Sequence, residues 1–271
     1  EAPQMNFFKG TLENEPNSLV EFSVAENFMS GTIFSEQSTY RFGPDGNPFD
    51  GMNTMKPHLV YNVNKVNTDD WKDRELCVFD DAQIANFLDN IENIYPEGEP
   101  EDLSQVPPEE LPPMVAESQV TYDQVQVAIE GDNELYQDFG NSQSAVFAYY
   151  ASMINSINVI YQRDVQVDLV ISYQRVWTTS SDPYSSNSTS TTLSQLRNYW
   201  NSNMSGVTRD TCHLLSGRPV SGGIAYLSAL CSGSIGYGLT QVHGSTNTAT
   251  SSGLWDLVAV AHELGHNHGT H

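Results

Sequence analysis

Prolines concentrate in one acidic segment of the chain and divide it into two parts. Six of the 13 prolines lie between Pro96 and Pro113, in a stretch that is also rich in Glu and Asp. Proline lacks a backbone N–H donor and disfavours helix and sheet interiors, and repulsion between carboxylates extends such a segment further. We therefore expect residues 95–118 to form an exposed linker that proteases can cut, between a domain at 1–94 and a domain at 119–271. A long surface loop within one domain is the alternative.

The net charge is strongly negative and unevenly distributed. Residues 1–118 hold 23 Asp and Glu against six Lys and Arg, and residues 119–271 hold 11 against five, for a total of −23. Phosphates would be repelled by such a chain, which excludes nucleic acid and anionic membrane surfaces as partners. The chain begins at Glu1 with no signal-like segment before Phe7, so we expect any export signal to have been removed already.

Hydrophobic patterns indicate an α+β fold, with a β-rich part before the linker. There, the pattern predicts strands at Phe22–Val24, Gly31–Phe34 and His58–Val63 and a helix at Asp81–Ile91. After the linker, strands and helices alternate. We predict strands at Val125–Ile129, Val165–Trp177, Gly223–Leu227 and Tyr237–Val242, and helices at Ser142–Tyr161, Thr192–Asn203 and Leu254–Asn267.

The last predicted helix carries the residues with the clearest chemistry. It contains the pattern His262-Glu263-x-x-His266. On a helix, the two histidines are one turn apart on the same face, where two neutral imidazoles can bind one Zn²⁺. Glu263, beside the first histidine, is placed to act as a general base and then a general acid. A helix end with incidental histidines is the bland alternative, and the apolar run Leu257–Ala261 argues against it.

The third zinc ligand is expected just beyond the given sequence. Gly269 fits the glycine of the longer pattern His-Glu-x-x-His-x-x-Gly-x-x-His, whose last histidine would fall at position 272. His271 is one place early, and His268 is expected to be a neighbour rather than a ligand. We therefore expect the third ligand just after His271, and a C-terminal subdomain that is missing from this chain.

These residues together resemble an adamalysin/reprolysin-type metzincin over nearly the whole chain. The most specific block is Val258–Gly269. Further blocks resemble that family's first strand, first long helix, second strand and edge strand, at Val125–Asp132, Ile154–Tyr161, Val165–Val170 and Gly223–Cys231. The stretch Phe8–Ser23 resembles the start of a reprolysin pro-domain.

The resemblance implies the fold, the activity and the partners of the chain. It implies a β-rich pro-domain followed by a metzincin catalytic domain, with a mixed twisted sheet and an active-site helix. The chain would be the precursor of a secreted zinc endopeptidase that cleaves proteins or peptides and is inhibited by its own pro-domain. Substrate would pair with an edge strand, at Gly223, Ile224, Ala225 and Tyr226.

The resemblance leaves calcium insecure as a second metal. The family's calcium-ligating Glu aligns with Gln126 here, and neutral Gln is a weaker oxygen donor. Asp182 could still contribute a ligand.

The three cysteines allow two further predictions, each with an alternative. Cys212 and Cys231 lie 19 residues apart, and we expect a disulfide between them in an exported protein, with two reduced buried thiols as the alternative. Cys77 is then left in the pro-region, where its thiolate could bind zinc and inhibit the enzyme. The resemblance implies such a switch, because pro-regions of this family often use a cysteine in this way. A buried structural cysteine is the competing interpretation. For the whole chain, a non-catalytic secreted binding module with an incomplete metal site is the alternative function.

Overall fold

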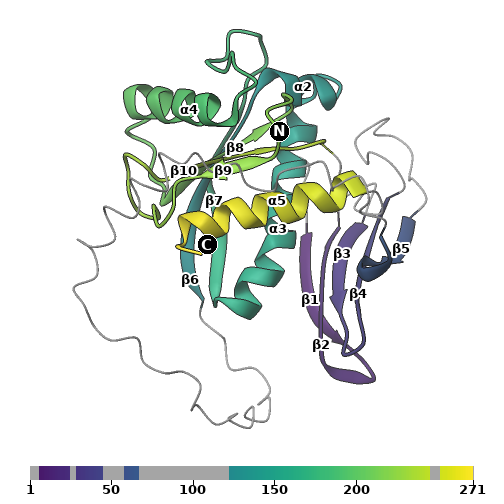
Figure 1. The fold of residues 1–271 in the computed structure, drawn as a ribbon. Coiled ribbons are helices and arrows are strands. Elements are labelled where there is room, and N and C mark those ends of the chain that lie inside the picture. The colour runs from purple at the N-terminus through teal and green to yellow at the C-terminus, as the bar shows by residue number, and fades with distance from the viewer. Residues whose placement is uncertain (1–5, 25–28, 45–57, 67–121, 245–250, 271) are drawn as a thin grey trace, which may run out of the picture. The chain divides into compact units, whose positions relative to one another are not determined.

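The computed structural model describes residues 6–24, 29–44, 58–66, 122–244 and 251–270, which hold two five-stranded sheets (Figure 1). The predicted linker at 95–118, the predicted helix at Asp81–Ile91 and Cys77 lie outside the described residues. Among the residues that are described, no helix combines the length and apolar character needed to cross a membrane.

The N-terminal sheet is an antiparallel meander in chain order. Its strands are β1 (Asn6–Leu12), β2 (Glu15–Val24), β3 (Met29–Phe34), β4 (Thr39–Pro44) and β5 (His58–Asn62), followed by the short 3₁₀ helix η1 (Val63–Lys65). The strands predicted from sequence match β2, β3 and β5. Sequence analysis missed β1, because the apolar residues Phe7 and Phe8 are adjacent and break the alternation of apolar and polar residues. Both are about half exposed in the structure. It also missed β4. A Gly-Pro pair is typical of a turn, but Gly43 and Pro44, the last residues of this strand, pair with β5.

The second sheet is mixed and has the order β7-β6-β8-β10-β9. Its strands are β6 (Asp123–Gly131), β7 (Val167–Val176), β8 (Thr211–Ser216), β9 (Gly223–Ala225) and β10 (Tyr237–Gln241). β6, β7, β8 and β10 run parallel, and the edge strand β9 runs antiparallel to β10. The predicted mixed sheet is confirmed. The central strand β8 was missed because it is buried on both faces and therefore shows no alternation of apolar and polar residues.

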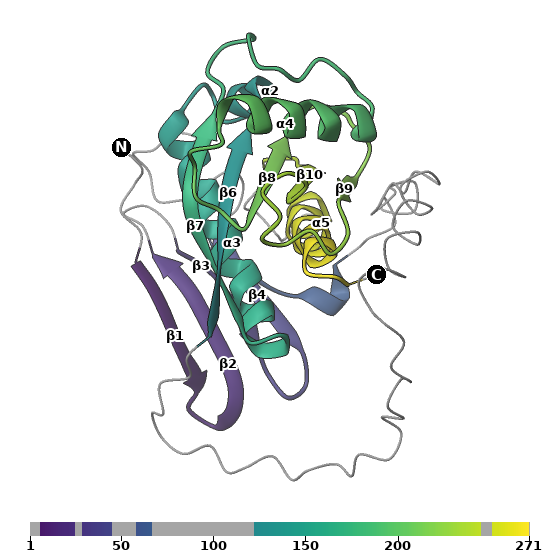
Figure 2. The same cartoon turned by 90° about the vertical axis from the view of Figure 1, so that its left-hand side faces the viewer.

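Helices cover both faces of this sheet. They are α2 (Asn133–Asp138), α3 (Gln143–Asp164), α4 (Thr189–Asn203) and α5 (Ser251–Asn267). One core joins α3 and α5 to one face of the sheet, and a second core joins α4 to the other face (Figure 2). A capping residue precedes each of α2, α3 and α4, and its side chain accepts a hydrogen bond from the backbone N–H three residues later. The capping residues are Asp132, Ser142 and Ser188.

A buried carboxylate ties the second core together. Glu130 on β6 is fully buried and accepts hydrogen bonds from Arg175 (2.7 Å), from the Tyr184 hydroxyl (2.7 Å) and from the indole nitrogens of Trp177 and Trp200. A buried charge is tolerated when it is paired and fully hydrogen-bonded. The network therefore holds β6, β7, α4 and the segment that leads into α4 in one arrangement.

Candidate metal centre

The C-terminal end of α5 is shaped by Gly269. Its φ is +98°, a conformation that glycine adopts without strain. The backbone N–H of Gly269 bonds to His266 O, and that of Thr270 bonds to Gly265 O, which together form a Schellman motif. The glycine predicted to end this helix therefore does so, and it turns the chain back over the last helical turn.

This turn orients the second histidine of the motif. His266 is buried, and its Nδ1 lies 2.8 Å from the carbonyl oxygen of Thr270. Because a carbonyl only accepts, Nδ1 carries a proton in this bond, and Nε2 is the ring nitrogen on the opposite side. Metal-binding histidines are typically oriented in this way, by a hydrogen bond from the other ring nitrogen.

His262 directs its own Nε2 at the same point. The two Nε2 atoms are 3.0 Å apart, and the ring planes are inclined at 81°. His262 is half-buried, and burial, followed by the charge of His266, lowers its imidazole pKa and favours the neutral form. The predicted pair therefore directs two imidazole nitrogens at one point, as two ligands of one ion would be directed.

Glu263 lies beside the two histidines as a buried carboxyl group. Neither of its oxygens has a hydrogen-bond partner among the described residues, and its side chain is fully shielded from solvent. Burial raises the pKa of this carboxyl to about 9. Buried polar groups are normally hydrogen-bonded or bound to an ion, so a carboxyl group in this position fits a site that binds a ligand.

The donors present fit a zinc ion. Across the described ranges, His262, Glu263 and His266 are the one cluster of three His, Cys, Asp or Glu side chains whose ligand atoms lie within 4.8 Å of one another. His268 is not part of it: its Nδ1 donates to Leu264 O and its ring packs edge-on against Tyr161. His271 lies outside the described residues.

The edge strand β9 packs directly on Glu263. A Cβ atom added to Gly223 would lie 2.5 Å from Glu263 Cγ and 2.6 Å from Oε1, so only glycine leaves room for the carboxyl group. Among the other residues predicted to bind substrate, Ile224 is buried in the core shared with α4, Ala225 is buried and Tyr226 is half-buried. In the described sheet, β9 pairs with β10 on one side only. Its other edge is therefore the one that an extended peptide could join.

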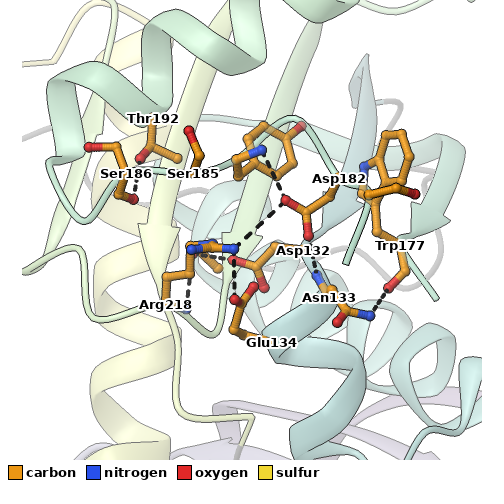
Figure 3. Close-up of polar contacts among 12 residues, drawn as sticks. Asp132, Asn133, Glu134, Trp177, Asp182, Ser185, Ser186, Thr192 and Arg218 are labelled. Carbon is orange, nitrogen blue, oxygen red and sulfur yellow. Dashed lines mark hydrogen bonds and ion pairs between the residues drawn. The ribbon is translucent and has the colours of Figure 1, made fainter. Parts of the chain in front are cut away.

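A polar cluster anchors the loop that enters β9. Figure 3 shows Arg218, in this loop, pointing toward Glu134 and Asp182, with Nη2 to carboxylate oxygen distances of 2.7 and 4.0 Å. The buried carboxylate of Asp132 accepts hydrogen bonds from the Ser216 hydroxyl and from Gly217 N (3.0 Å). These contacts fix the start of the loop to the N-terminus of α2.

Sequence reasoning missed two side chains that hold α5. The Tyr161 hydroxyl donates to Ala261 O (2.8 Å), immediately before His262. Asn267, fully buried at the end of α5, bonds to β8, to β10 and to Tyr226, which follows β9. Asp256, Glu263 and Asn267 recur at helical spacing on the inner side of the helix. Polar residues in otherwise apolar positions were the signal that could have identified Asn267.

The predicted disulfide is absent from the structure. Cys212 and Cys231 are both free thiols, because Cys212 is buried in the core under α4 whereas Cys231 is exposed. The Cys231 thiol lies 3.4 Å from Asp210 Oδ1. The two side chains thus occupy separate environments.

The residues considered for calcium do not come together with free oxygen donors. Gln126 is exposed, and its backbone N–H bonds to Asp210 (2.8 Å). The Asp182 carboxylate already accepts the backbone N–H groups of Asn133 (3.2 Å) and Tyr184 (2.9 Å). Within the described parts of the chain, Asp182 belongs to no cluster of three His, Cys, Asp or Glu ligands.

Comparison with known proteins gives three matches. Residues 147–271 match the model of the reprolysin-like metallopeptidase family M12B. Snake venom metalloproteinase Ac1 of Deinagkistrodon acutus is 24% identical over 149 residues, which cover 54% of this chain and 70% of that protein. A solved structure described as a chaperone-substrate complex matches with a TM-score of 0.44 and 17% identity, over 56% of this chain and 24% of that one. Residues 147–271 are thus similar in sequence to reprolysin-like metallopeptidases.

Proposed function

We propose that the chain is the precursor of a secreted zinc endopeptidase. The observation that carries the proposal is the convergence of the His262 and His266 Nε2 atoms, 3.0 Å apart, beside the buried carboxyl group of Glu263. The match of residues 147–271 to reprolysin-like metallopeptidases supports the same chemistry. Secretion is supported by the venom metalloproteinase relative.

His262 and His266 would hold the zinc ion, and a third ligand would follow His271, where the metzincin pattern places it. Zinc supplies Lewis acidity, which acidifies a water molecule and polarises the scissile carbonyl. Glu263, kept ionised by the positive charge of the bound zinc, which lowers a carboxyl pKa, would accept a proton from the attacking water and deliver it to the amine nitrogen as the peptide C–N bond breaks. Its buried position excludes bulk water and keeps the proton transfer local.

The substrate would be an extended peptide added to the free edge of β9. Main-chain hydrogen bonds of that kind fix the register of a peptide with little dependence on its side chains. Gly223 brings this edge against Glu263, so a peptide paired with β9 would pass close to both the carboxyl group and the two histidines.

The N-terminal sheet would be the pro-domain. Its contacts with α3 include two hydrogen bonds: Arg41 Nη2 donates to Ser156 Oγ (3.1 Å), and Asn155 Nδ2 donates to Ser23 Oγ (3.0 Å). Polar contacts of this kind suit two parts that later separate, because each group regains water when they do.

Cys77 remains the proposed zinc-binding switch. Cys77→Ser should then raise cleavage before the linker is cut, and unchanged latency would count against the switch.

A Glu263→Gln variant of the full-length protein tests the mechanism. Gln keeps the shape of Glu but cannot take up the proton, so we expect a loss of about 10²–10⁴-fold in peptide cleavage, with bound zinc unchanged. Asp123→Asn, at an exposed carboxylate in the proposed catalytic domain, is the matched control. Zinc content and casein cleavage, with and without a chelator, are the measurements.

The result separates the proposed enzyme from the alternative binding module. Full cleavage by the zinc-loaded Glu263→Gln variant would refute the assigned role of Glu263. A wild-type protein that binds zinc but cleaves nothing after its linker is cut would instead favour the non-catalytic module.

A further inference from the structure

The side chain of Asn267 joins the end of α5 to two strands of the sheet and to the residue that follows β9. Its Oδ1 accepts a hydrogen bond from the Thr211 hydroxyl on β8 (2.6 Å). Its Nδ2 donates to the carbonyl oxygen of Tyr226, directly after β9 (2.8 Å), and to that of Tyr237 on β10 (3.2 Å). The amide is fully buried, so these bonds have no competition from water.

The backbone repeats the same connection. Ser228 N donates to His266 O (2.8 Å), and Leu230 N donates to Asn267 O (3.0 Å). The chain leaving β9 is therefore hydrogen-bonded to the last turn of α5 at Tyr226, Ser228 and Leu230. α5 and β9 lie next to each other for this reason (Figure 2).

Asparagine is suited to this position by its donors and acceptor. Both Nδ2 hydrogens and one Oδ1 lone pair are used, and the amide carries no charge that would have to be buried. Aspartate would keep the acceptor, but it would turn a carboxylate toward two carbonyl oxygens. Alanine would leave the Thr211 hydroxyl and the Tyr226 carbonyl without this partner.

We propose that Asn267 is a positioning residue that sets the distance between the peptide-binding edge of β9 and the metal-binding turn of α5. It is next to His266 in sequence and holds Tyr226, so it links the two parts that must be aligned with the scissile bond. The inference depends on the proposed endopeptidase function for its kinetic consequence. Its structural consequence, that this amide helps to hold residues 226–230 against α5, is independent of the proposed function.

The kinetic test compares Asn267→Ala with Asn158→Ala in the full-length protein after the linker is cut. Asn158 is a matched control, because its side chain also joins a helix to a strand, by two bonds to the backbone of Leu169 (2.9 and 2.7 Å) on the far edge strand β7. A misplacement of about 1 Å in an active site lowers the rate about 10²-fold. We expect Asn267→Ala to lower kcat/KM for an extended peptide by about that factor, and Asn158→Ala to change it less than threefold.

Metal binding separates positioning from loss of the site. Both histidines stay on α5, so zinc affinity, measured by competition with a chromophoric chelator, should change less than threefold in Asn267→Ala. A visible Co²⁺ spectrum like that of the wild type would agree with this. Equal losses of activity in the two asparagine variants, or a loss of zinc affinity as large as the loss of kcat/KM, would overturn the proposal.

Hydrogen exchange tests the inference even if the protein proves not to be a protease. We expect the amides of Ser228 and Leu230 to exchange at least tenfold faster in Asn267→Ala, while amides in the middle of α3 keep their wild-type rates. Unchanged exchange at Ser228 and Leu230 would refute the positioning role by itself. If Asn267→Ala does not fold, Asn267→Ser, which retains a smaller polar side chain, is measured in the same way.

Discussion

Replacing Gly223 by alanine is the sharpest test of how β9 and α5 are fitted together. The added Cβ would lie 2.5 Å from Glu263 Cγ and 2.7 Å from Cδ, whereas carbon atoms in contact are normally about 3.5–4.0 Å apart. About 1 Å of relief is therefore needed. The carboxyl group of Glu263 must move, or the strand must lift from the helix.

Either movement should reduce catalysis far more than stability. A displacement of about 1 Å corresponds to a loss of about 10²-fold in kcat/KM. Overpacking of a buried site costs about 1–3 kcal/mol, and the alanine regains about 0.4–1 kcal/mol by restricting the unfolded chain. We expect the variant to stay folded and to bind zinc.

The assay is peptide cleavage by the activated full-length protein, with thermal unfolding and zinc content measured on the same samples. Gly206→Ala is the matched control, because a Cβ at Gly206 meets nothing within 4 Å. If zinc-loaded Gly223→Ala keeps kcat/KM within threefold of wild type, then Glu263 is not the group that the tight contact positions for catalysis, and the reasoning fails.

Two further predictions concern groups away from the metal centre. Burial lowers the pKa of His213 to about 3, well below its value in an unfolded chain, so the unfolded state binds the extra proton between about pH 6.5 and 3. The free energy of unfolding should thus fall with acidification in this range by up to about 1.4 kcal/mol per pH unit. Urea unfolding of His213→Gln, repeated across this range, should give a free energy of unfolding that depends less steeply on pH. An unchanged pH dependence would contradict this. In a Cys77→Ser background, a thiol reagent should label the exposed Cys231 in the native protein and the buried Cys212 only after unfolding. Native labelling that persists in Cys231→Ser would contradict the burial of Cys212, and a lack of any native labelling would show that the two thiols are not free.

Much of the secondary structure and the central motif could be predicted from local patterns. The helix that carries His262, Glu263 and His266 was predicted at Leu254–Asn267 and is observed as α5 (Ser251–Asn267). Its apolar positions recur at helical spacing, and Gly269 ends it through a positive φ. Such features depend on neighbours within one or two turns, so a single sequence contains them.

Strands without alternation and contacts between distant segments escaped prediction. β8 is buried on both faces and its sequence could equally suit a helix, so only its pairing with β6 and β10 identifies it. The spacing of Cys212 and Cys231 suggested a disulfide, but spacing says nothing of which way each side chain points. The pleat of β8 directs Cys212 into the core under α4, away from the exposed Cys231.

The sequence by itself determined which residues could bind a metal, because their spacing of four on a helix places two imidazoles on one face. The tertiary structure decided how that pair is completed. Glu263 is buried because Gly223 of β9 packs against it, and the backbone at Thr270 orients His266. Asn267 reaches β8, β10 and the residue after β9 only because the fold brings those segments to the end of α5. Spacing along a helix is a property of the local backbone, whereas packing between a helix and a sheet edge depends on residues that are distant in the chain.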